Sequence, residues 1–205
     1  MEFMKHITSI LISICFIQHD NSKILDEIIS YNNKIVLEHY KEKEKVLNSI
    51  LYISVKRQKM YHIDKNKIIQ TYIISTSKYG IGNKEKSNMT PLGYHVIKEK
   101  YGENTPIFGK MKGRIFTGEI ATIYTDETKS KTDDITSRLL WLDGLEPGKN
   151  KGDGIDSFKR YIYIHGTSEE GLLGSPASHG CIRMKNKAVI ELYKKVKIGT
   201  LVLIL

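Results

Sequence analysis

The sequence is poor in cysteine and in long apolar runs, and each shortage excludes a class of protein. Its 205 residues include only two cysteines, Cys15 and Cys181, so there is no disulfide framework and no Cys-x-x-Cys metal-binding motif. The apolar run at residues 7–17 is too short for a comfortable membrane span, which takes about 20 residues. With 40% apolar and 27% charged residues, the chain is neither a multi-spanning membrane protein nor a disordered one.

Arginine is scarce as well, and this limits which partners the net positive charge of the chain can indicate. Lysine and arginine together exceed the acidic residues by nine (32 against 23), but 27 of the 32 are lysines spread along the chain. Direct readout of nucleic-acid bases favours arginine in clustered basic motifs. We therefore predict no nucleic-acid partner, and a general attraction to an anionic polymer or surface instead.

The first 19 residues resemble a secretory signal. Lys5 precedes the apolar run at residues 7–17, as in a positively charged n-region followed by an h-region. No Ala-x-Ala cleavage site follows, so an uncleaved N-terminal anchor and an apolar first helix remain open. Cys15 is a poor lipid-attachment site, because a bulky residue precedes it. We expect export to the periplasm or cell envelope, with N-terminal membrane association where the segment is retained. Where it is removed, Cys181 is the only thiol.

The rest of the chain is long enough for one domain of ordinary size. Residues 20–48 suit a helical lead-in, because apolar residues recur there at loosely helical spacing. From residue 49 onward, alternating apolar residues separated by turn-forming ones indicate half-buried strands. Strands are expected at residues 50–55, 60–63, 68–75, 94–97, 115–124, 139–142, 160–164 and 201–205. Asn186 should cap a short helix near the C-terminus. We predict a mostly β domain with short helices over residues 49–205.

One cluster of residues carries the parts of a cysteine nucleophile site. Such a site needs a thiolate, an acceptor for the thiol proton, and donors for the negative charge on the attacked carbonyl oxygen. Cys181 would supply the thiol, and His165, at the end of an expected strand, would supply a rigidly held imidazole. The glycine-containing loop between them can bring the two together. Gly180 leaves its own N–H and that of Cys181 unobstructed as oxyanion donors.

A single cysteine or histidine is more often an ordinary buried or surface residue than a catalytic one. The run Ser178-His179-Gly180-Cys181, however, arises by accident in on the order of one in several thousand chains of this length. His165-Gly166-Thr167 upstream makes accident a weaker explanation still.

These motifs resemble the catalytic domain of the L,D-transpeptidase family. That family's pattern is His-Gly, a glycine-containing loop and Ser-His-Gly-Cys-x-Arg-Met, which stands here as His165-Gly166 and residues 178–184. Thr90-Pro91-Leu92-Gly93 is similar to the family's recurring Thr-Pro-x-Gly segment, and residues 199–202 are similar to its tail. Residues 98–159 are longer than a minimal domain of this kind needs, so we expect an insertion or substrate lid there.

The resemblance implies a β-sandwich of mixed sheets, and acyl transfer on peptidoglycan stem peptides with no cofactor and no metal. Cys181 would attack the carbonyl at the L-centre of diaminopimelate, form a thioester and release D-alanine. An amine of a neighbouring stem would then take the acyl group to give a 3-3 cross-link. Water would instead give a shortened stem, which is the activity of an L,D-carboxypeptidase. Release of a wall-anchored lipoprotein through the same thioester is a further alternative.

The resemblance also implies roles for the other motif residues. His165 would take the thiol proton and His179 would support the nucleophile, although His179 is close enough in sequence to affect the thiol itself. Arg183 would hold a substrate carboxylate by a bidentate contact, or be a structural arginine instead. Ser178 and Thr167, one in each motif, are expected to contact substrate.

Other classes of function leave weaker traces in the sequence. Ser75-Thr76-Ser77-Lys78 fits the Ser-x-x-Lys pattern, but about two such matches are expected by chance from the Ser and Lys content, and no Ser-Asp-Asn accompanies it. No Gly-x-Ser-x-Gly, Walker loop or His-Glu-x-x-His occurs. A metal site at His165, His179 and Cys181, and a wall-binding module without turnover, remain alternatives.

Overall fold

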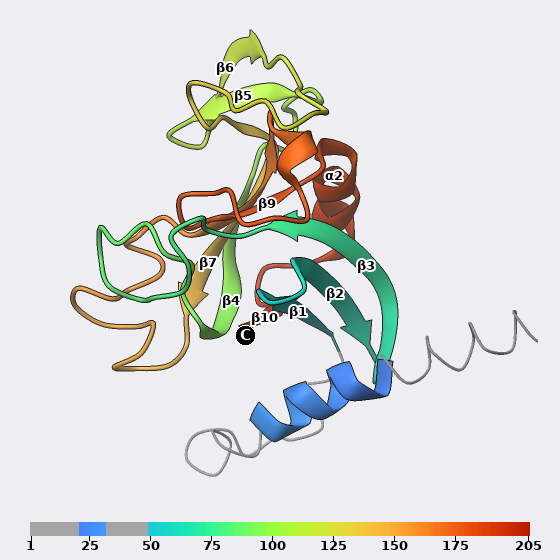
Figure 1. Ribbon diagram of the computed structural model, residues 1–205, viewed down its shortest axis with the longest axis vertical. Helices are drawn as coiled ribbons and strands as arrows, with labels where there is room; N and C mark the ends of the chain where they lie inside the picture. Colours follow the sequence, from blue (N-terminus) through green and yellow to red (C-terminus); the bar gives the residue numbers. More distant parts are fainter. Residues whose placement is uncertain (1–20, 32–48) are drawn as a thin grey trace, which may run out of the picture.

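A computed structural model describes residues 21–31 and 49–205, and the fold is mostly β with short helices, as predicted (Figure 1). Residues 21–31 are helical. The strands are β1 (Ile50–Ser54), β2 (Lys59–Asp64), β3 (Lys67–Ser75), β4 (Gly93–Tyr101), β5 (Gly109–Lys112), β6 (Ile115–Ile120), β7 (Ile135–Gly144), β8 (Tyr163–Thr167), β9 (Ile182–Met184) and β10 (Leu201–Ile204). A 3-10 turn, η1 (Glu170–Leu172), follows β8, and helix α2 (Asn186–Lys195) precedes β10.

The strands form one continuous mixed sheet in the order β4-β10-β1-β2-β3-β9-β8-β7-β5-β6. Because β4 also pairs with β7, the strands from β4 round to β7 close into a ring, and the two walls of the expected sandwich are joined along both sides. The pairs β1–β10 and β8–β9 are parallel. The β5–β6 hairpin continues the sheet beyond the ring, at the end of the molecule away from the helix at residues 21–31 (Figure 1).

The interior of the ring is filled by apolar side chains from both walls and from α2. The central cluster draws Leu51 from β1, Ile97 from β4 and Ile182 from β9 into one core. Helix α2 adds Val189 and Leu192, which are fully buried on the face that contacts the sheet. Burial of each such side chain contributes about 1.5–3 kcal/mol, and this core holds β8 and β9 rigidly in place.

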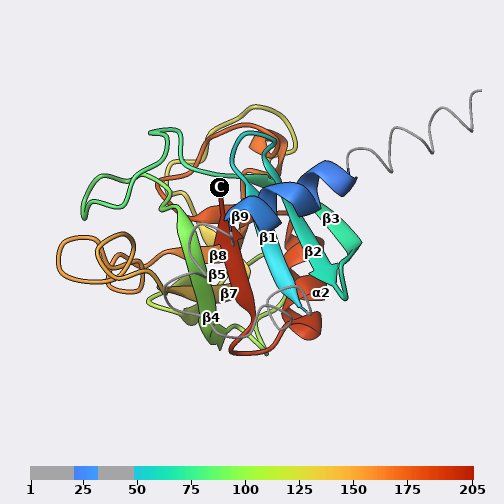
Figure 2. The ribbon, with the colours of Figure 1, turned by 90° about the horizontal axis from the view of Figure 1, so that it is seen from below.

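β1 is buried on both faces, whereas its alternating pattern predicts a half-buried strand. All five of its residues are buried. Leu51 and Ile53 belong to the central core, and the residues that alternate with them pack against apolar side chains of the helix at residues 21–31. That helix lies across the outside of the ring beside β1 (Figures 1 and 2). The expected solvent face is therefore a second, smaller core.

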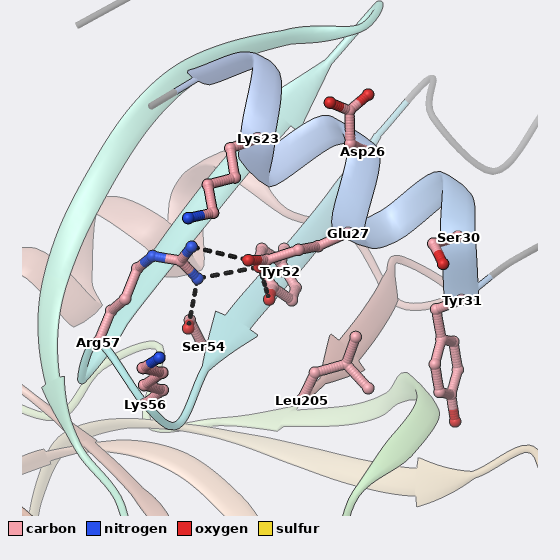
Figure 3. Close-up of a pocket in the computed structure, with 10 residues that line it drawn as sticks. All are labelled: Lys23, Asp26, Glu27, Ser30, Tyr31, Tyr52, Ser54, Lys56, Arg57 and Leu205. Atoms are coloured by element: carbon pink, nitrogen blue, oxygen red, sulfur yellow. Dashed lines mark hydrogen bonds and ion pairs between the residues drawn. The ribbon is translucent and has the colours of Figure 1, made fainter. Parts of the chain in front are cut away.

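Polar contacts also tie this helix to the sheet (Figure 3). Glu27 accepts hydrogen bonds from both terminal nitrogens of Arg57, at 2.9 and 2.7 Å, and from the hydroxyl of Tyr52 at 2.7 Å. Together with Lys23 and Leu205, these side chains line an open cavity of about 520 Å³. Residues 21–31 form the described part of the expected helical lead-in.

The strand that carries His165 is shifted from its expected position. The sequence predicts a strand at residues 160–164, but β8 begins at Tyr163 and ends at Thr167. A turn precedes it, in which the Tyr161 N–H donates to the Phe158 carbonyl at 3.0 Å and Tyr161 has a φ of 56°. His165 consequently lies in the middle of β8 rather than at its end.

Asn186 does not cap α2, so that prediction is wrong. It is the first helical residue, and Lys185 occupies the N-cap position without a side-chain hydrogen bond. The buried amide of Asn186 instead donates to the Thr167 carbonyl and to Glu170 Oε1, both at 2.8 Å. The side chain that the sequence suggested as a helix cap thus makes a tertiary contact between α2 and the end of β8.

Residues 98–159 are not one continuous insertion. They include β7, which pairs with β4, β5 and β8 and is part of the ring. The segment expected as a strand at residues 115–124 forms β6 only as far as Ile120, where it pairs with β5. The β5–β6 hairpin is the part that stands outside the ring, and its role as a lid stays a prediction.

Residues 1–20 and 32–48 lie outside the described residues. The predicted signal or anchor at residues 1–19 and most of the lead-in after residue 31 fall there. Within residues 21–31 and 49–205, no helix is both long and apolar enough to cross a membrane.

Candidate active site

Strands β8 and β9 lie side by side in parallel, and their register positions the two predicted reactive residues. Ile164 pairs with Ile182, and both side chains point into the central core. His165 pairs with Arg183. Because side chains alternate along a strand, His165 and Arg183 project from the opposite face, together with Cys181, which immediately precedes β9. The sheet therefore presents the predicted nucleophile and the predicted base on one face of neighbouring strands.

The half-buried side chain of Cys181 is held between two backbone groups. Its thiol donates to the Tyr161 carbonyl and accepts from the Tyr163 N–H, with Sγ at 3.4 Å from each partner. Loss of solvent raises the pKa of the Cys181 thiol to about 12, although the Tyr163 N–H lowers it and the carboxylate of Asp133 adds to the rise. Cys181 is a thiol rather than a thiolate at neutral pH, so its attack on a carbonyl needs a proton acceptor.

His165 is buried, with only 2% of its surface exposed. Its Nδ1 lies 2.7 Å from the Gly166 carbonyl oxygen, and because a carbonyl can only accept, Nδ1 carries the hydrogen. Nε2 is then the atom with a lone pair. Burial lowers the pKa of His165 below its ordinary value, and the Gly166 carbonyl and Asp133 partly offset this. The imidazole is therefore neutral and in the tautomer that a general base requires.

His179 is in a different environment from His165. It is exposed, and its Nδ1 lies 2.6 Å from Oδ2 of Asp133. Its ring is also 5.7 Å from that of Tyr79, measured between centroids. His179 thus stands at the rim of the site and is oriented by a carboxylate from the segment before β7. The supporting role that the family resemblance implies for it stays a prediction.

Arg183 is buried beneath the site, with a side chain only 1% exposed. Its Nη1 lies 2.6 Å from Oε2 of Glu169 and its Nη2 lies 2.5 Å from Oδ1 of Asp133. Glu169 in turn accepts hydrogen bonds from the amide and hydroxyl of Ser130, at 2.6 and 2.9 Å. The guanidinium of Arg183 is thus paired with two carboxylates, which fits the alternative that Arg183 is a structural arginine. Its bidentate contact with a substrate carboxylate stays a prediction.

Ser178 and Gly180 shape the turn that leads into Cys181. The hydroxyl of Ser178 donates to the Cys181 carbonyl at 2.6 Å and accepts from the Gly180 N–H at 3.2 Å. The hydroxyl of Thr90 donates to the Gly180 carbonyl at 3.0 Å. Gly180 has a φ of +121°, a conformation that side-chain-bearing residues rarely adopt. To act as an oxyanion donor, the Gly180 N–H would have to donate to the substrate oxygen as well as to the Ser178 hydroxyl, which it now contacts at 3.2 Å.

Thr167, the third residue expected to contact substrate, is fully buried. Its hydroxyl accepts from the Glu169 N–H at 3.1 Å, and its carbonyl accepts from the side chain of Asn186. Ser178 is also buried, at 1% exposed. The described contacts of both residues are with the protein itself, so their predicted contact with substrate stays a prediction.

Sequence reasoning missed the two carboxylates of the site. Asp133 lies on the segment before β7 and contacts both His179 and Arg183. It is held in a left-handed conformation with a φ of 46°, and the guanidinium of Arg183 holds its pKa below the usual range despite its burial. Glu169 lies two residues after the His165-Gly166-Thr167 motif, but that motif itself does not call for a carboxylate there. Nothing in the sequence around Asp133 sets it apart from its exposed neighbours.

An open groove of about 220 Å³ lies beside the nucleophile, lined among others by Arg160, Tyr161 and His179. Tyr161, whose carbonyl accepts from the Cys181 thiol, is one of the residues that line this groove. Within residues 21–31 and 49–205, no three of the histidine, cysteine, aspartate and glutamate side chains are grouped so that they could hold a metal ion.

The chain belongs to the L,D-transpeptidase catalytic domain family, which it matches over residues 48–204. This match confirms the resemblance that the two histidine-containing motifs indicate. A crystal structure of an L,D-transpeptidase from Xylanimonas cellulosilytica DSM 15894 is similar over 82% of this chain and 65% of that chain, with a TM-score of 0.50 and 17% sequence identity. At that identity the similarity supports the fold alone.

Two curated relatives from Bacillus subtilis (strain 168) are similar over a short segment. "Putative L,D-transpeptidase YqjB" is 49% identical over 45 residues, and "Putative L,D-transpeptidase YkuD" is 50% identical over 46 residues. Each segment is 22% of this chain, and the matches span 26% and 28% of the relatives' own length. This chain thus matches only about a quarter of either relative.

Proposed function

We propose that this protein is a peptidoglycan L,D-transpeptidase in which Cys181 is the nucleophile and His165 is the proton donor and acceptor. One observation carries the proposal: a protonated thiol lies on the same face of neighbouring strands as a buried, neutral imidazole. The imidazole has its Nδ1 engaged by the Gly166 carbonyl, so Nε2 can accept. Membership of the family supports transpeptidase chemistry at this site.

In the acylation step, the thiol proton of Cys181 passes to Nε2 of His165 while Sγ attacks the carbonyl carbon at the L-centre of diaminopimelate. The negative charge that develops on the carbonyl oxygen is stabilised by the N–H groups of Cys181 and Gly180. Collapse of the tetrahedral intermediate breaks the peptide bond. The departing amine of D-alanine takes the proton from His165, which leaves a thioester on Cys181.

In the second step, an amine of a neighbouring stem attacks the thioester carbonyl and loses a proton to His165. The carbon–sulfur bond then breaks, and the proton returns to the sulfur of Cys181. The product is a 3-3 cross-link. The same two steps with water in place of the amine give a tripeptide stem. With a peptide that anchors a lipoprotein as the donor, they release the lipoprotein.

The reaction is tested by incubating the protein with a disaccharide-tetrapeptide and analysing the products by mass spectrometry. A cross-linked dimer with loss of D-alanine is the expected product. A tripeptide monomer alone would show that the enzyme trims stems rather than joining them. If neither product forms while the protein releases a wall-anchored lipoprotein, the cross-linking proposal is wrong and the third reaction stands.

A non-catalytic wall-binding module would not acylate Cys181. A penem that acylates activated thiols should add its mass to wild-type protein, and much more slowly to a His165→Ala variant. Equal labelling of the two proteins would argue against an activated thiol and in favour of a binding module.

We also propose that the protein is exported and acts in the periplasm or cell envelope, on the basis of the Lys5 and residue 7–17 pattern. The expected result is recovery of the protein from the envelope fraction of its native host. Recovery of the full-length chain from the cytosol would contradict export.

A further inference from the structure

The groove beside Cys181 has three cationic side chains among its lining residues. Lys86 comes from the loop between β3 and β4, and Lys159 and Arg160 come from the loop between β7 and β8. Glu85 is the one carboxylate among the lining residues, and His179 completes the rim. The two loops project from the same side of the ring (Figures 1 and 2) and are joined by a hydrogen bond of 2.6 Å from the Glu85 N–H to the Gly154 carbonyl.

Arg160 is half-buried but has no anionic partner. Its guanidinium donates to the carbonyls of Met89 and Gly82, at 2.7 and 3.2 Å, and to the hydroxyl of Ser87 at 3.4 Å. All three acceptors are neutral. Within residues 21–31 and 49–205, no carboxylate lies within ion-pair distance of this side chain. A guanidinium has five N–H donors, so some remain for a ligand.

A half-buried cation without a counterion is costly, because desolvation of the charge is not offset by pairing. Burial accordingly lowers the pKa of Arg160, while the nearby Cys181 and Glu85 groups raise it. Arg183, the other buried arginine of the site, shows the contrast, since two carboxylates neutralise it. Arg160 is therefore the cation that is left available beside the nucleophile.

Lys86 and Lys159 add positive charge at the exposed rim of the groove. Lys159 makes only a 3.4 Å contact with Asp153, and both side chains in that pair are open to solvent. Such a pair is weak, so Lys159 can turn toward a ligand at little cost. Three cations against one carboxylate give the groove a positive potential next to the Cys181 thiol.

We propose that Arg160, with Lys86 and Lys159, forms a subsite that binds a carboxylate of the substrate beside the scissile bond. The inference rests on the proposed function for its substrate class, a stem peptide. Two carboxylates of the donor stem fit this chemistry: that of the terminal D-alanine, and that at the D-centre of diaminopimelate. Bidentate contact with the guanidinium would fix the peptide relative to Cys181, which is how such arginines orient substrates.

The test compares three tetrapeptides: one with both carboxylates free, one with D-alanine as the carboxamide, and one with the D-centre as the carboxamide. Wild-type protein should lose about tenfold to a hundredfold in kcat/KM with one of the two amides, the worth of one or two charge-assisted hydrogen bonds. The amide that shows the loss identifies the bound carboxylate. Arg160→Gln, which keeps donors for the Met89 carbonyl, should remove most of this discrimination.

Matched lysine variants separate charge from folding. Lys159→Gln and Lys86→Gln lie at exposed positions and should each reduce the preference by about twofold to fivefold, a typical rim contribution. Lys187→Gln on α2 removes the same charge far from the groove and should leave the preference for the free carboxylate unchanged. If Arg160→Gln slowed all three peptides equally, the guanidinium would be a structural pin of the loop, and the subsite proposal would be wrong.

Binding to a Cys181→Ala protein distinguishes this inference from the proposed function. The Kd values of the three peptides are measured by calorimetry with and without Arg160→Gln. A carboxylate preference that depends on Arg160 supports the subsite even if no peptide is turned over. Equal Kd values for all three peptides, together with equal kcat/KM in wild-type protein, overturn it even if cross-links form.

Discussion

Cys181 and His165 have separate tasks in the proposed reaction, and substitutions should separate them. Cys181→Ser should nearly abolish turnover, because an alcohol is a far poorer nucleophile at a site arranged for a thiol. His165→Ala should slow acylation by a factor on the order of 10²–10⁴, the usual contribution of a positioned general base. His179→Ala should cost less, since this exposed residue contacts Asp133 at the rim. Single-turnover acylation rates measure all three.

The assignment of the base depends on the order of the two histidine variants. If His179→Ala slowed acylation more than His165→Ala did, with both proteins still folded by circular dichroism, His179 would be the proton acceptor and His165 a structural residue. The Cys181 nucleophile would be unaffected by that outcome.

The pH dependence of acylation should follow His165. Burial lowers the pKa of His165 from its ordinary value near 6.5 and raises that of Cys181 to about 12. Since the neutral imidazole is the active form, kcat/KM should rise with pH through an apparent pKa below that ordinary value and stay level up to about pH 9. A midpoint near the ordinary thiol pKa would mean that a thiolate forms before attack. His165→Ala should lose the rising limb.

At the residue scale, what could be predicted from sequence was what lies close together in the chain. Cys181, His179 and Gly180 form one run of residues, and His165 is recognisable by its own short motif. Asp133 is held at the site by His179 and Arg183, and Arg160 is held by the loop between β3 and β4. Neither residue stands in a motif. Their contacts are tertiary, so local pattern carries no sign of them.

At the scale of elements, Glu169 connects three segments. It contacts Arg183 on β9 and Ser130 on the segment before β7, and it lies two residues after the end of β8. Glu169→Gln keeps the shape but removes the charge, so it should lower the free energy of unfolding by about 3–5 kcal/mol, as expected when one partner of a buried pair is lost. Urea denaturation measures the change.

The matched control is Glu119→Gln on β6. Its carboxylate is 70% exposed and pairs with Lys110 at 3.4 Å, so the cost should be at most about 0.5 kcal/mol. If both variants were equally stable, the pairing of Arg183 with Glu169 would contribute nothing to stability and the structural role of Arg183 would be in doubt.

In the helix at residues 21–31, two adjacent isoleucines allow a second comparison of a buried with an exposed position. Ile28 is fully buried against the sheet, whereas Ile29 is 42% exposed. Ile28→Ala should cost about 2–4 kcal/mol of stability, or release the helix from the sheet, because it empties the contact with β1. Ile29→Ala should cost less than about 1 kcal/mol. Urea denaturation and limited proteolysis within the helix report both effects, and equal behaviour of the two variants would contradict the described packing.

The strands also show where prediction from sequence stops. The hairpin of β2 and β3 was expected nearly to the residue, because a turn-forming segment separates two apolar runs. β5 and β9 were missed, since strands as short as Gly109–Lys112 and Ile182–Met184 carry too few residues to show a period. The shift of β8 has a different cause: Arg160 and Tyr161 fit a strand pattern but are needed in the turn that reaches Cys181.

At the scale of the whole molecule, the excess of nine positive charges should govern contact with an anionic wall polymer. Retention on isolated peptidoglycan carrying anionic polymer should weaken steeply between about 0.05 and 0.5 M NaCl, over which the screening length falls from more than 10 Å to less than 5 Å. The turnover number at saturating soluble peptide should change much less, because it depends on groups already in contact. Salt-independent retention in a pull-down assay would point to a specific, uncharged contact instead.

The position of β10 in the ring bears on when the fold can be completed. β10 (Leu201–Ile204) lies between β1 and β4, pairing with the first strand of the ring on one side and with β4 on the other. Until residues 201–204 have been synthesised, β1 and β4 have no neighbour to join them, and the ring stays open along that seam. Closure is thus a contact between the two ends of the domain, which makes folding slow and late. Folding of the domain is therefore expected to finish only after β10 has been added, and a chain whose ring is still open would suit the export that we propose.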